Sequence, residues 1–284
     1  MLEITDIAEM QRQALDWKRS GRPVVFVPTM GFLHEGHVSL MRLARARLPD
    51  ARLVVSIFVN PAQFGPQEDF ARYPRDLAHD RALCAENGVD LLFLPIAPAI
   101  YPEGFATWVE PGEIAAVFEG AIRPGHFRGI ATVVLKLFQL VQPDAAVFGQ
   151  KDAQQVAVLK QMTRDLNLPV KLIIAPTRRE DDGLALSSRN VYLSPEERSQ
   201  APALSAALRT AVQMIKLGQR SGDAVRARME VVVREQSLAR LDYADAVDAV
   251  TFKPLDKLSG NVLLLIAARF GTTRLIDNEL LVIG

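Results

Sequence analysis

Two histidines stand three residues apart in the segment PTMGFLHEGHVSL, which occupies residues 28–40. His34 and His37 lie at the start of a predicted helix, within about 60° of each other around its axis, so both imidazoles can face one ligand. The N–H groups and partial positive charge of a helix N-terminus suit a phosphate. Gly31 and Gly36 have no Cβ and would let a nucleotide lie against the backbone. The segment therefore predicts a site where imidazoles stabilise charge on a phosphoryl group.

A zinc site is a weaker interpretation of the same segment. The helical metalloprotease motif H-E-x-x-H needs histidines four apart, and His34 and His37 are only three apart. The single cysteine, Cys84, excludes an intrachain disulfide and a cysteine-cluster metal site, and we expect it to be a buried structural thiol. No metal ligand is assigned from spacing.

A second polar segment, GQKDAQQ, occupies residues 149–155 at another predicted strand-to-helix turn. Lys151 could approach a polyphosphate, and Asp152 could cap the helix or orient a ribose or a metal-bound water. Gln155 lies one turn further on, where its amide could hold a carboxylate or a hydroxyl. A capping aspartate beside a solvated lysine and glutamine is the alternative interpretation.

Two further loops complete the set. LSSRN, residues 186–190, places two hydroxyls and the Arg189 guanidinium after a glycine-containing turn, a plausible clamp for pyrophosphate. A solvated interdomain loop is the alternative. NPAQFG, residues 60–65, offers the neutral amides of Asn60 and Gln63, which suit a small polar organic substrate better than a charged polymer.

Several well-known catalytic motifs are absent from the sequence. There is no G-x-x-x-x-G-K-[ST] phosphate loop, no G-x-G-x-x-G dinucleotide fingerprint and no G-x-S-x-G nucleophile elbow. The pattern favours positioning and electrostatics over covalent catalysis.

These polar segments follow short apolar runs that alternate with helical ones. Strands are predicted at 22–28, 51–59, 90–94, 145–148 and 170–175, and helices at 36–48, 76–87, 129–141 and 152–166. Strands separated by helical runs of about 10–15 residues indicate βαβ units and a mainly parallel sheet. Ligands of such sheets bind beyond the carboxyl ends of the strands, where all four polar segments fall.

The pattern changes after about residue 194. Amphipathic helices are predicted at 195–217 and 223–236, followed by apolar strands that include 261–270 and 273–283. We predict an α/β domain over residues 1–177 and a smaller α+β domain over residues 178–284.

Composition narrows the function further. The chain has 284 residues, of which 49% are hydrophobic and 23% charged, and its 33 basic and 33 acidic residues leave no net field favouring nucleic acid or an anionic membrane. No signal peptide is visible, and no apolar run approaches the ~18 residues of a membrane span. We expect a cytoplasmic enzyme that binds neither nucleic acid nor membrane.

Five segments together resemble the defining stretches of the pantothenate synthetase family, in order and with compatible spacing. They are PTMGFLHEGHVSL, VSIFVNPAQFGPQEDFARYPRD, RPGHFRGIATVVLKLF, VFGQKDAQQVAVLKQM and DGLALSSRNVYLS. The resemblance implies a Rossmann-like parallel sheet flanked by helices, a smaller C-terminal lid domain and a homodimer. It also implies ATP, Mg²⁺, pantoate and β-alanine as reactants, and pantothenate, AMP and pyrophosphate as products. Asp76, Asp80 and Asp152 are candidate ligands of the Mg²⁺, and spacing does not choose among them.

The resemblance also implies roles for individual residues. His34, His37, Lys151 and Arg189 would be catalytic, with His37 the proton donor. Pantoate would be held by Gln63 and Gln155, with Asn60 and Arg123 also in that cleft. The ATP site would consist of Met30, Gly31, Phe32, Leu33, His34, Glu35, Gly36, His37, Gly149, Gln150, Lys151, Asp152, Arg178, Leu186, Ser187, Ser188 and Arg189. Arg178 departs from the family pattern, which more often has an apolar residue beside the adenine.

Two other functions remain open from the residues alone. The H-x-G-H helix would serve a nucleotidyltransferase equally well, but a phosphorylated acceptor would want more Arg or Lys than Gln63 and Gln155 provide. A module that only senses ATP would bind without turnover, and four candidate catalytic side chains argue against it.

Overall fold

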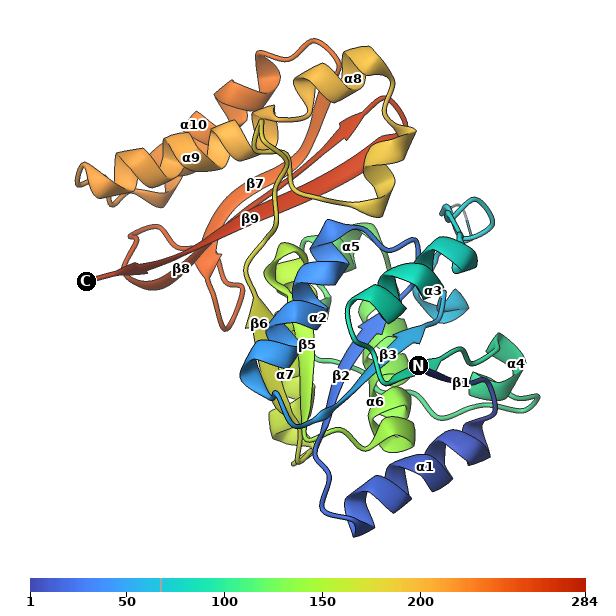
Figure 1. The fold of residues 1–284 in the computed structure, drawn as a ribbon. Helices are drawn as coiled ribbons and strands as arrows, with labels where there is room; N and C mark the ends of the chain where they lie inside the picture. Colours follow the sequence, from blue (N-terminus) through green and yellow to red (C-terminus); the bar gives the residue numbers. More distant parts are fainter. Residues whose placement is uncertain (67) are drawn as a thin grey trace. The chain divides into compact units, whose positions relative to one another are not determined.

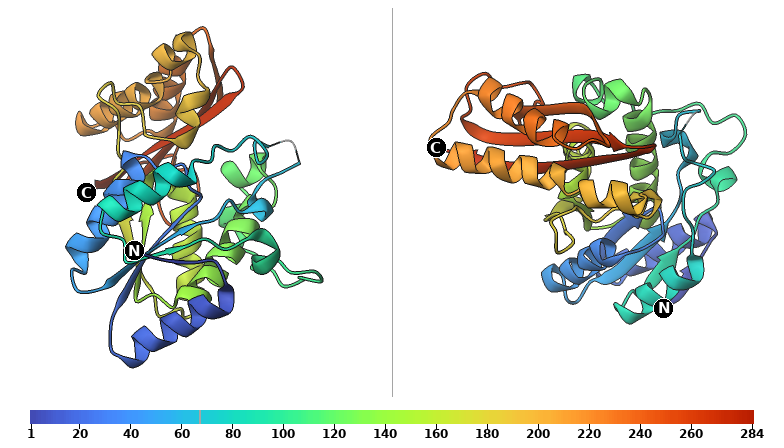
Figure 2. Two further views of the ribbon diagram at one scale, coloured as in Figure 1. Left: turned by 45° about the vertical axis from the view of Figure 1, so that its right-hand side comes forward. Right: turned by 90° about the horizontal axis from the view of Figure 1, so that it is seen from above.

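The computed structural model of the chain describes residues 1–66 and 68–284. They form two compact units, and each unit takes in two stretches of chain. The larger unit comprises Met1–Gly149 and Gln154–Pro176, and the smaller unit comprises Gln150–Ala153 and Thr177–Gly284. Figure 1 shows the elements of both units in chain order, and Figure 2 gives two further views.

The larger unit is built on a parallel sheet of six strands in the order β1-β4-β3-β2-β5-β6. The strands are β1 (Leu2–Ile4), β2 (Val24–Thr29), β3 (Arg52–Ile57), β4 (Leu91–Phe93), β5 (Ala145–Gly149) and β6 (Lys171–Ala175). The central strands are continuous apolar runs because a parallel sheet is covered on both faces. The predicted parallel sheet is confirmed.

Helices cover this sheet. They are α1 (Ile7–Arg19), α2 (Glu35–Arg47), α3 (Leu77–Glu86), α4 (Ala97–Ile100), α5 (Glu119–Ile122), α6 (His126–Val141) and α7 (Ala153–Asp165), with 3-10 turns η1 (Pro61–Gln63) and η2 (Glu113–Ala115). The 3-10 turn η3 (Gln150–Asp152), between β5 and α7, belongs to the smaller unit. Met41 of α2 and Cys84 of α3 are fully buried with the sheet side chains of Val27 and Val55. Cys84 is thus a core thiol, and burial raises its pKa to about 12.

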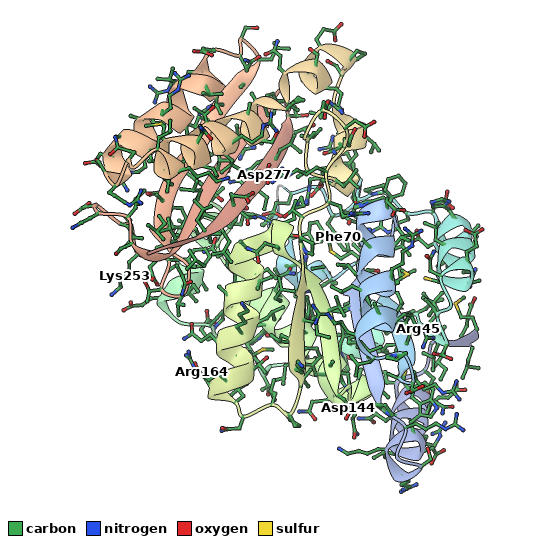
Figure 3. The ribbon with its side chains drawn as sticks, turned by 60° about the vertical axis from the view of Figure 1, so that its left-hand side comes forward. Arg45, Phe70, Asp144, Arg164, Lys253 and Asp277 are labelled. Carbon is green, nitrogen blue, oxygen red and sulfur yellow. The ribbon has the colours of Figure 1, made fainter. Side chains whose placement is uncertain are left out.

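The strand order reverses at the centre of the sheet. From β2 the chain steps outward through β3 to β4, and it then returns to place β5 on the other side of β2. Val24 N–H donates to the Asp144 carboxylate at 2.7 Å, which ties the start of β2 to the start of β5. Figure 3 labels Asp144 among the side chains of the chain. Such a switch point is where doubly wound sheets bind ligands, beyond the carboxyl ends of the two strands.

The smaller unit packs helices on an antiparallel sheet of three strands, in the order β7-β8-β9. The elements are η4 (Ser188–Tyr192), α8 (Pro195–Gln200), α9 (Ala203–Lys216), α10 (Gly222–Arg234), β7 (Ala239–Asp248), β8 (Gly260–Phe270) and β9 (Thr273–Ile283). Leu208 and Met229, from the two long helices, are buried in one core cluster with Leu264 of the central strand. The unit therefore has a core of its own.

The predicted elements differ from the observed ones at particular residues. A single helix over 195–217 is wrong, because α8 ends at Gln200 and α9 begins at Ala203. Pro202 lies between them, and a proline has no N–H with which to continue the hydrogen-bond ladder. Helix α1 and strand β1, at the N-terminus, are absent from the prediction.

Candidate active site

The H-x-G-H segment leaves β2 through a tight loop. Thr29 Oγ1 accepts from Gly31 N–H at 3.2 Å and donates to the Ser56 carbonyl at 2.8 Å. Gly31 and Phe32 then adopt left-handed φ angles of 83° and 52°. A Cβ on Gly31 would lie 2.8 Å from a methyl carbon of Ile57, so the glycine is required by close packing as well as by φ. This is a different reason for Gly31 from the nucleotide contact predicted above.

A buried carboxylate fixes the same loop from below. Asp80, on α3, is 1% exposed and accepts from Phe32 N–H at 2.9 Å and Leu33 N–H at 2.6 Å. Burial raises the pKa of the Asp80 carboxyl, and the two N–H groups partly oppose that rise. Because both carboxylate oxygens accept a hydrogen bond from the backbone of the loop, Asp80 holds the loop in place.

The two histidines are held by backbone N–H groups at the start of α2. Gly36 N–H donates to Nδ1 of His34 at 3.1 Å, and His34 N–H donates to Nδ1 of His37 at 3.2 Å. The ring centroids are 4.1 Å apart. Since a backbone N–H can only donate, each Nδ1 carries a lone pair, and each neutral ring has its proton on Nε2. Both imidazoles therefore have an Nε2–H donor beside a helix N-terminus. Phosphate oxygens accept hydrogen bonds, so this arrangement suits a phosphate.

A group of neutral amides lies next to this loop. Gln63 donates from Nε2 to the Met30 sulfur at 3.2 Å and accepts on Oε1 from Asn60 Nδ2 at 3.1 Å. Asn60 is 1% exposed, and its Oδ1 accepts from the Tyr101 hydroxyl at 2.8 Å. Burial raises the pKa of Tyr101, which keeps its proton available for that bond. Asn60 thus orients the amide of Gln63 from within the protein.

The backbone around Gln63 is held from α6. A Cβ on Gly129 would lie 2.3 Å from the Ala62 carbonyl oxygen, so only glycine lets the helix approach this turn. His126 Nδ1 lies 2.8 Å from the Gln63 carbonyl, to which it donates, and its Nε2 accepts from Arg123 at 2.8 Å. Burial, with the adjacent Arg123 charge, lowers the pKa of His126 to about 4, so this ring is neutral.

Arg123 is part of the same network. Its guanidinium pairs with Glu68 at 2.5 Å, where both side chains are largely buried. The predicted substrate residue Arg123 therefore lies beside the Gln63 backbone with its charge matched by a carboxylate.

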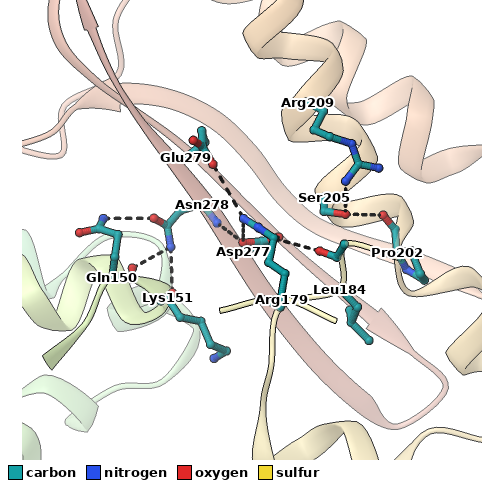
Figure 4. Close-up of polar contacts among 12 residues, drawn as sticks. Gln150, Lys151, Arg179, Leu184, Pro202, Ser205, Arg209, Asp277, Asn278 and Glu279 are labelled. Carbon is teal, nitrogen blue, oxygen red and sulfur yellow. Dashed lines mark hydrogen bonds and ion pairs between the residues drawn. The ribbon is translucent and has the colours of Figure 1, made fainter. Parts of the chain in front are cut away.

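The smaller unit contains the lysine segment. Gln150, Lys151 and Asp152 form η3, and Lys151 Nζ lies 3.3 Å from an Asp152 oxygen. The backbone of this turn is held by Asn278 on β9, whose Nδ2 donates to the carbonyls of Gln150 and Lys151 at 3.0 and 2.8 Å (Figure 4). Sequence reasoning missed Asn278.

The remaining predicted residues lie on a tight hairpin of the smaller unit. Leu186 N–H donates to the Arg178 carbonyl at 2.9 Å, and the chain reverses at Gly183, whose φ is 96°. Ser187 caps η4 by accepting from Arg189 N–H at 3.2 Å, and Ser188 is buried. The predicted clamp is thus a structured hairpin followed by a capped turn.

Within each unit, hydrogen bonds and ion pairs join most of the predicted residues. In the larger unit, the loop from Met30 to His37 joins Asn60, Gln63 and Arg123 through the bonds above, Gly149 ends β5, and Gln155 lies on α7. In the smaller unit, η3 and the Arg178–Arg189 segment lie against β9, η3 through Asn278 and the hairpin through an Arg179–Asp277 ion pair. The supporting side chains of Tyr101, His126 and Asn278 were not assigned to the site from sequence, and Asp80 was considered only as a ligand of Mg²⁺.

Among residues 1–66 and 68–284, every helix is too short or too polar to span a bilayer. In the same ranges, no three His, Cys, Asp or Glu side chains gather as a metal cluster.

Known proteins resemble this chain over nearly its whole length. A family model described as pantoate-β-alanine ligase matches residues 3–280. Pantothenate synthetase from Chloroflexus aggregans is 52% identical over 282 residues, covering 99% of this chain and all of the relative. The crystal structure of pantothenate synthetase from Thermus thermophilus has a TM-score of 0.91 and 48% identity, covering 98% of this chain and 99% of its own.

A further solved structure is described with bound molecules. It is pantoate-β-alanine ligase from Francisella tularensis complexed with β-γ ATP and β-alanine, with a TM-score of 0.78 and 34% identity over 99% of this chain and 97% of its own. The family model, the sequence relatives and the solved structures each match nearly the whole length of this chain. The chain therefore belongs to the pantoate-β-alanine ligase family.

Proposed function

We propose that the chain condenses pantoate with β-alanine at the expense of ATP, giving pantothenate, AMP and pyrophosphate through a pantoyl adenylate. The observation that supports this best is the pair of fixed tautomers at His34 and His37. Two Nε2–H donors at a helix N-terminus suit an anion whose charge grows during phosphoryl transfer.

Pantoate supplies the nucleophile for the first step. Its carboxylate oxygen attacks the α-phosphorus of ATP, the bond from that phosphorus to the bridging oxygen breaks, and pyrophosphate leaves. His34, His37, Lys151 and Arg189 donate to the phosphoryl oxygens, with His37 as the proton donor. Such preorganised donors act where charge develops and need no reorganisation at the moment of reaction.

Neutral amides hold the acid. Gln63 and Gln155 bind pantoate through hydroxyl and carboxylate contacts, and Asn60 and His126 keep Gln63 oriented by the bonds described above. Arg123, paired with Glu68, positions the same turn. The neutral amides of Gln63 and Gln155 suit a small hydroxy acid, and the nearby Arg123 charge is paired with Glu68, whereas a phosphorylated acceptor would favour more Arg or Lys.

The amine completes the reaction. The β-alanine nitrogen attacks the acyl carbon of the adenylate, its proton is lost, and the bond to the AMP phosphate oxygen breaks. Water must be excluded while the mixed anhydride exists. We propose residues 1–177 as the nucleotide and pantoate domain and residues 178–284 as the lid domain that provides this exclusion.

Magnesium, the homodimer and the cytoplasmic location stay predictions. Mg²⁺ usually binds one or two carboxylates together with substrate phosphates. Asp152 fits this role, because its side chain is 47% exposed beside Lys151, whereas Asp80 is committed to two backbone N–H groups. When bound, the ion would neutralise charge on the phosphates of ATP.

Exchange of labelled pyrophosphate into ATP tests the proposal, with Mg²⁺ and pantoate present and no amine. Exchange that requires pantoate and is not supported by acetate is the expected result. Exchange that is absent although ATP binds would contradict the adenylate mechanism.

A further inference from the structure

Two adjacent polar residues of strand β9, Asp277 and Asn278, are both buried. If only one face of the strand were covered, only one of the two would be buried. Side chains of a strand point alternately to opposite faces, so Asn278 shares a face with Ile276 and Leu280, while Asp277 points to the other face. Leu280 is 47% exposed, yet Asn278 and Asp277 are each 3% exposed. A particular segment of the chain must therefore cover Asn278, because this face of the strand is partly exposed to solvent elsewhere.

The covering segment is η3. Asn278 Nδ2 has two hydrogens, and they go to the carbonyls of Gln150 at 3.0 Å and Lys151 at 2.8 Å. Its Oδ1 accepts from Gln150 Nε2 at 3.1 Å. Each polar atom of the amide thus has a partner in η3 (Figure 4). Two of the three bonds hold backbone carbonyls, so they fix the path of the chain at Lys151.

The neighbouring side chain holds a second segment in the same way. The Asp277 carboxylate accepts hydrogen bonds from both terminal nitrogens of Arg179, at 2.5 and 3.0 Å. Arg179 also donates to the Gly183 carbonyl at 3.1 Å. Adjacent residues of one strand therefore hold η3 on one face and the hairpin on the other. The lysine turn is anchored to the smaller unit although β5, which precedes it, belongs to the larger unit.

We propose that Asn278 is a positioning residue for Lys151, which sets the direction from which the ammonium group meets the phosphates of ATP. The inference rests on the proposed function, in which Lys151 acts on those phosphates. Asn278 itself touches no reacting atom. Its two donated bonds cannot be made by a carboxylate, a hydroxyl or a methyl group in its place.

Pantoate-dependent pyrophosphate exchange in the full-length protein tests the proposal. Asn278→Asp keeps the shape of the side chain but replaces its NH₂ donor by an oxygen that repels both carbonyls. Asn278→Ser shortens the side chain, so its hydroxyl cannot reach both carbonyls. We expect kcat for exchange to fall about 10- to 100-fold in both, as for a misplaced catalytic group. The KM for pantoate should change little, because Gln63 and Gln155 lie in the larger unit. Asn261→Asp, at an exposed residue of the adjacent strand β8, is the matched control and should exchange at the wild-type rate.

A double-mutant cycle with Lys151→Ala separates positioning from a general structural effect. If Asn278 acts through Lys151, then Asn278→Ser should change the rate of Lys151→Ala by less than about threefold. Additive losses would overturn the proposal, as would wild-type exchange in both folded Asn278 variants. Failure of both to fold, judged by circular dichroism, would also overturn it, because Asn278 would then serve stability. If the wild-type protein shows no exchange, the proposed function itself fails, and this inference fails with it.

Discussion

In each unit, a buried polar side chain holds a short loop that contains predicted site residues. The side chain in the larger unit accepts hydrogen bonds from its loop, whereas the one in the smaller unit donates to its loop. In the larger unit, the Asp80 carboxylate accepts from the N–H groups of Phe32 and Leu33. In the smaller unit, the Asn278 amide donates to the carbonyls of Gln150 and Lys151. A loop that presents N–H groups inward needs an acceptor, and one that presents carbonyls inward needs a donor.

The difference has a consequence for pH. The larger unit relies on ionisable groups, Asp80 beneath the histidine loop and His126 beneath the Gln63 turn, both with shifted pKa values. An asparagine does not titrate, so the anchor of Lys151 is insensitive to pH. The two halves of the predicted site should therefore respond differently to acid and to substitution.

The largest expected effect comes from the catalytic side chains themselves. His37→Ala in the larger unit and Lys151→Ala in the smaller unit should each reduce pantoate-dependent exchange by roughly two to three orders of magnitude, because each removes one transition-state donor. Stopped-flow or quench measurement of pyrophosphate release gives the rate of the first step directly. A wild-type rate in either variant would remove that residue from the mechanism and leave the other unit to supply the chemistry.

Acid should next destabilise the larger unit through His126. Its folded pKa of about 4 lies below the ordinary value of 6.5, so its contribution to stability is full above pH 6.5 and is lost as pH falls towards 4. The loss should reach about 3 kcal/mol below pH 4. Both tryptophans, Trp17 and Trp108, lie in the larger unit, so their fluorescence during urea unfolding reports on this unit.

His126→Asn is the matched variant for that experiment, since its amide can still donate to the Gln63 carbonyl. The difference in unfolding free energy between wild type and variant should shrink as pH falls from 6.5 to 4. A difference that stays constant over this range would show that His126 is not the titrating group. The raised pKa of Asp80 acts in the opposite direction, because a raised folded pKa makes stability fall as pH rises, and it is common to both proteins.

Much of this arrangement was predictable because it follows from local pattern. Apolar runs that alternate with helical ones predict the parallel sheet, and the polar residues after β2 and β5 mark its switch point. The side chains proposed as donors also come from local segments of the sequence, and their roles in catalysis and ATP binding stay proposals.

The supporting side chains were not predictable in the same way, because their partners are distant in sequence. Asp80 lies 47 residues from Leu33, and Asn278 lies 128 residues from Gln150. One signal was available: Asp277 and Asn278 are adjacent, so in a strand they point to opposite faces, and at least one of them needs a polar partner if the strand is covered. Nothing local indicates that the partner would be the backbone of η3.

The smallest effect, and the most direct test of the comparison, is Asp80→Asn. The new amide keeps one acceptor but turns an NH₂ group towards a backbone N–H, which leaves that donor unpaired and costs about 1–3 kcal/mol. Tryptophan fluorescence during urea unfolding measures the loss, and Asp50→Asn, at an exposed residue, is the control that should change nothing. The rate of pyrophosphate exchange should fall in parallel at neutral pH, because the histidine loop loses one of the two hydrogen bonds that it donates to Asp80. If Asp80→Asn instead matches wild type in both stability and exchange, the charge of Asp80 is dispensable, and the histidine loop is fixed by Thr29 and the packing at Gly31 alone.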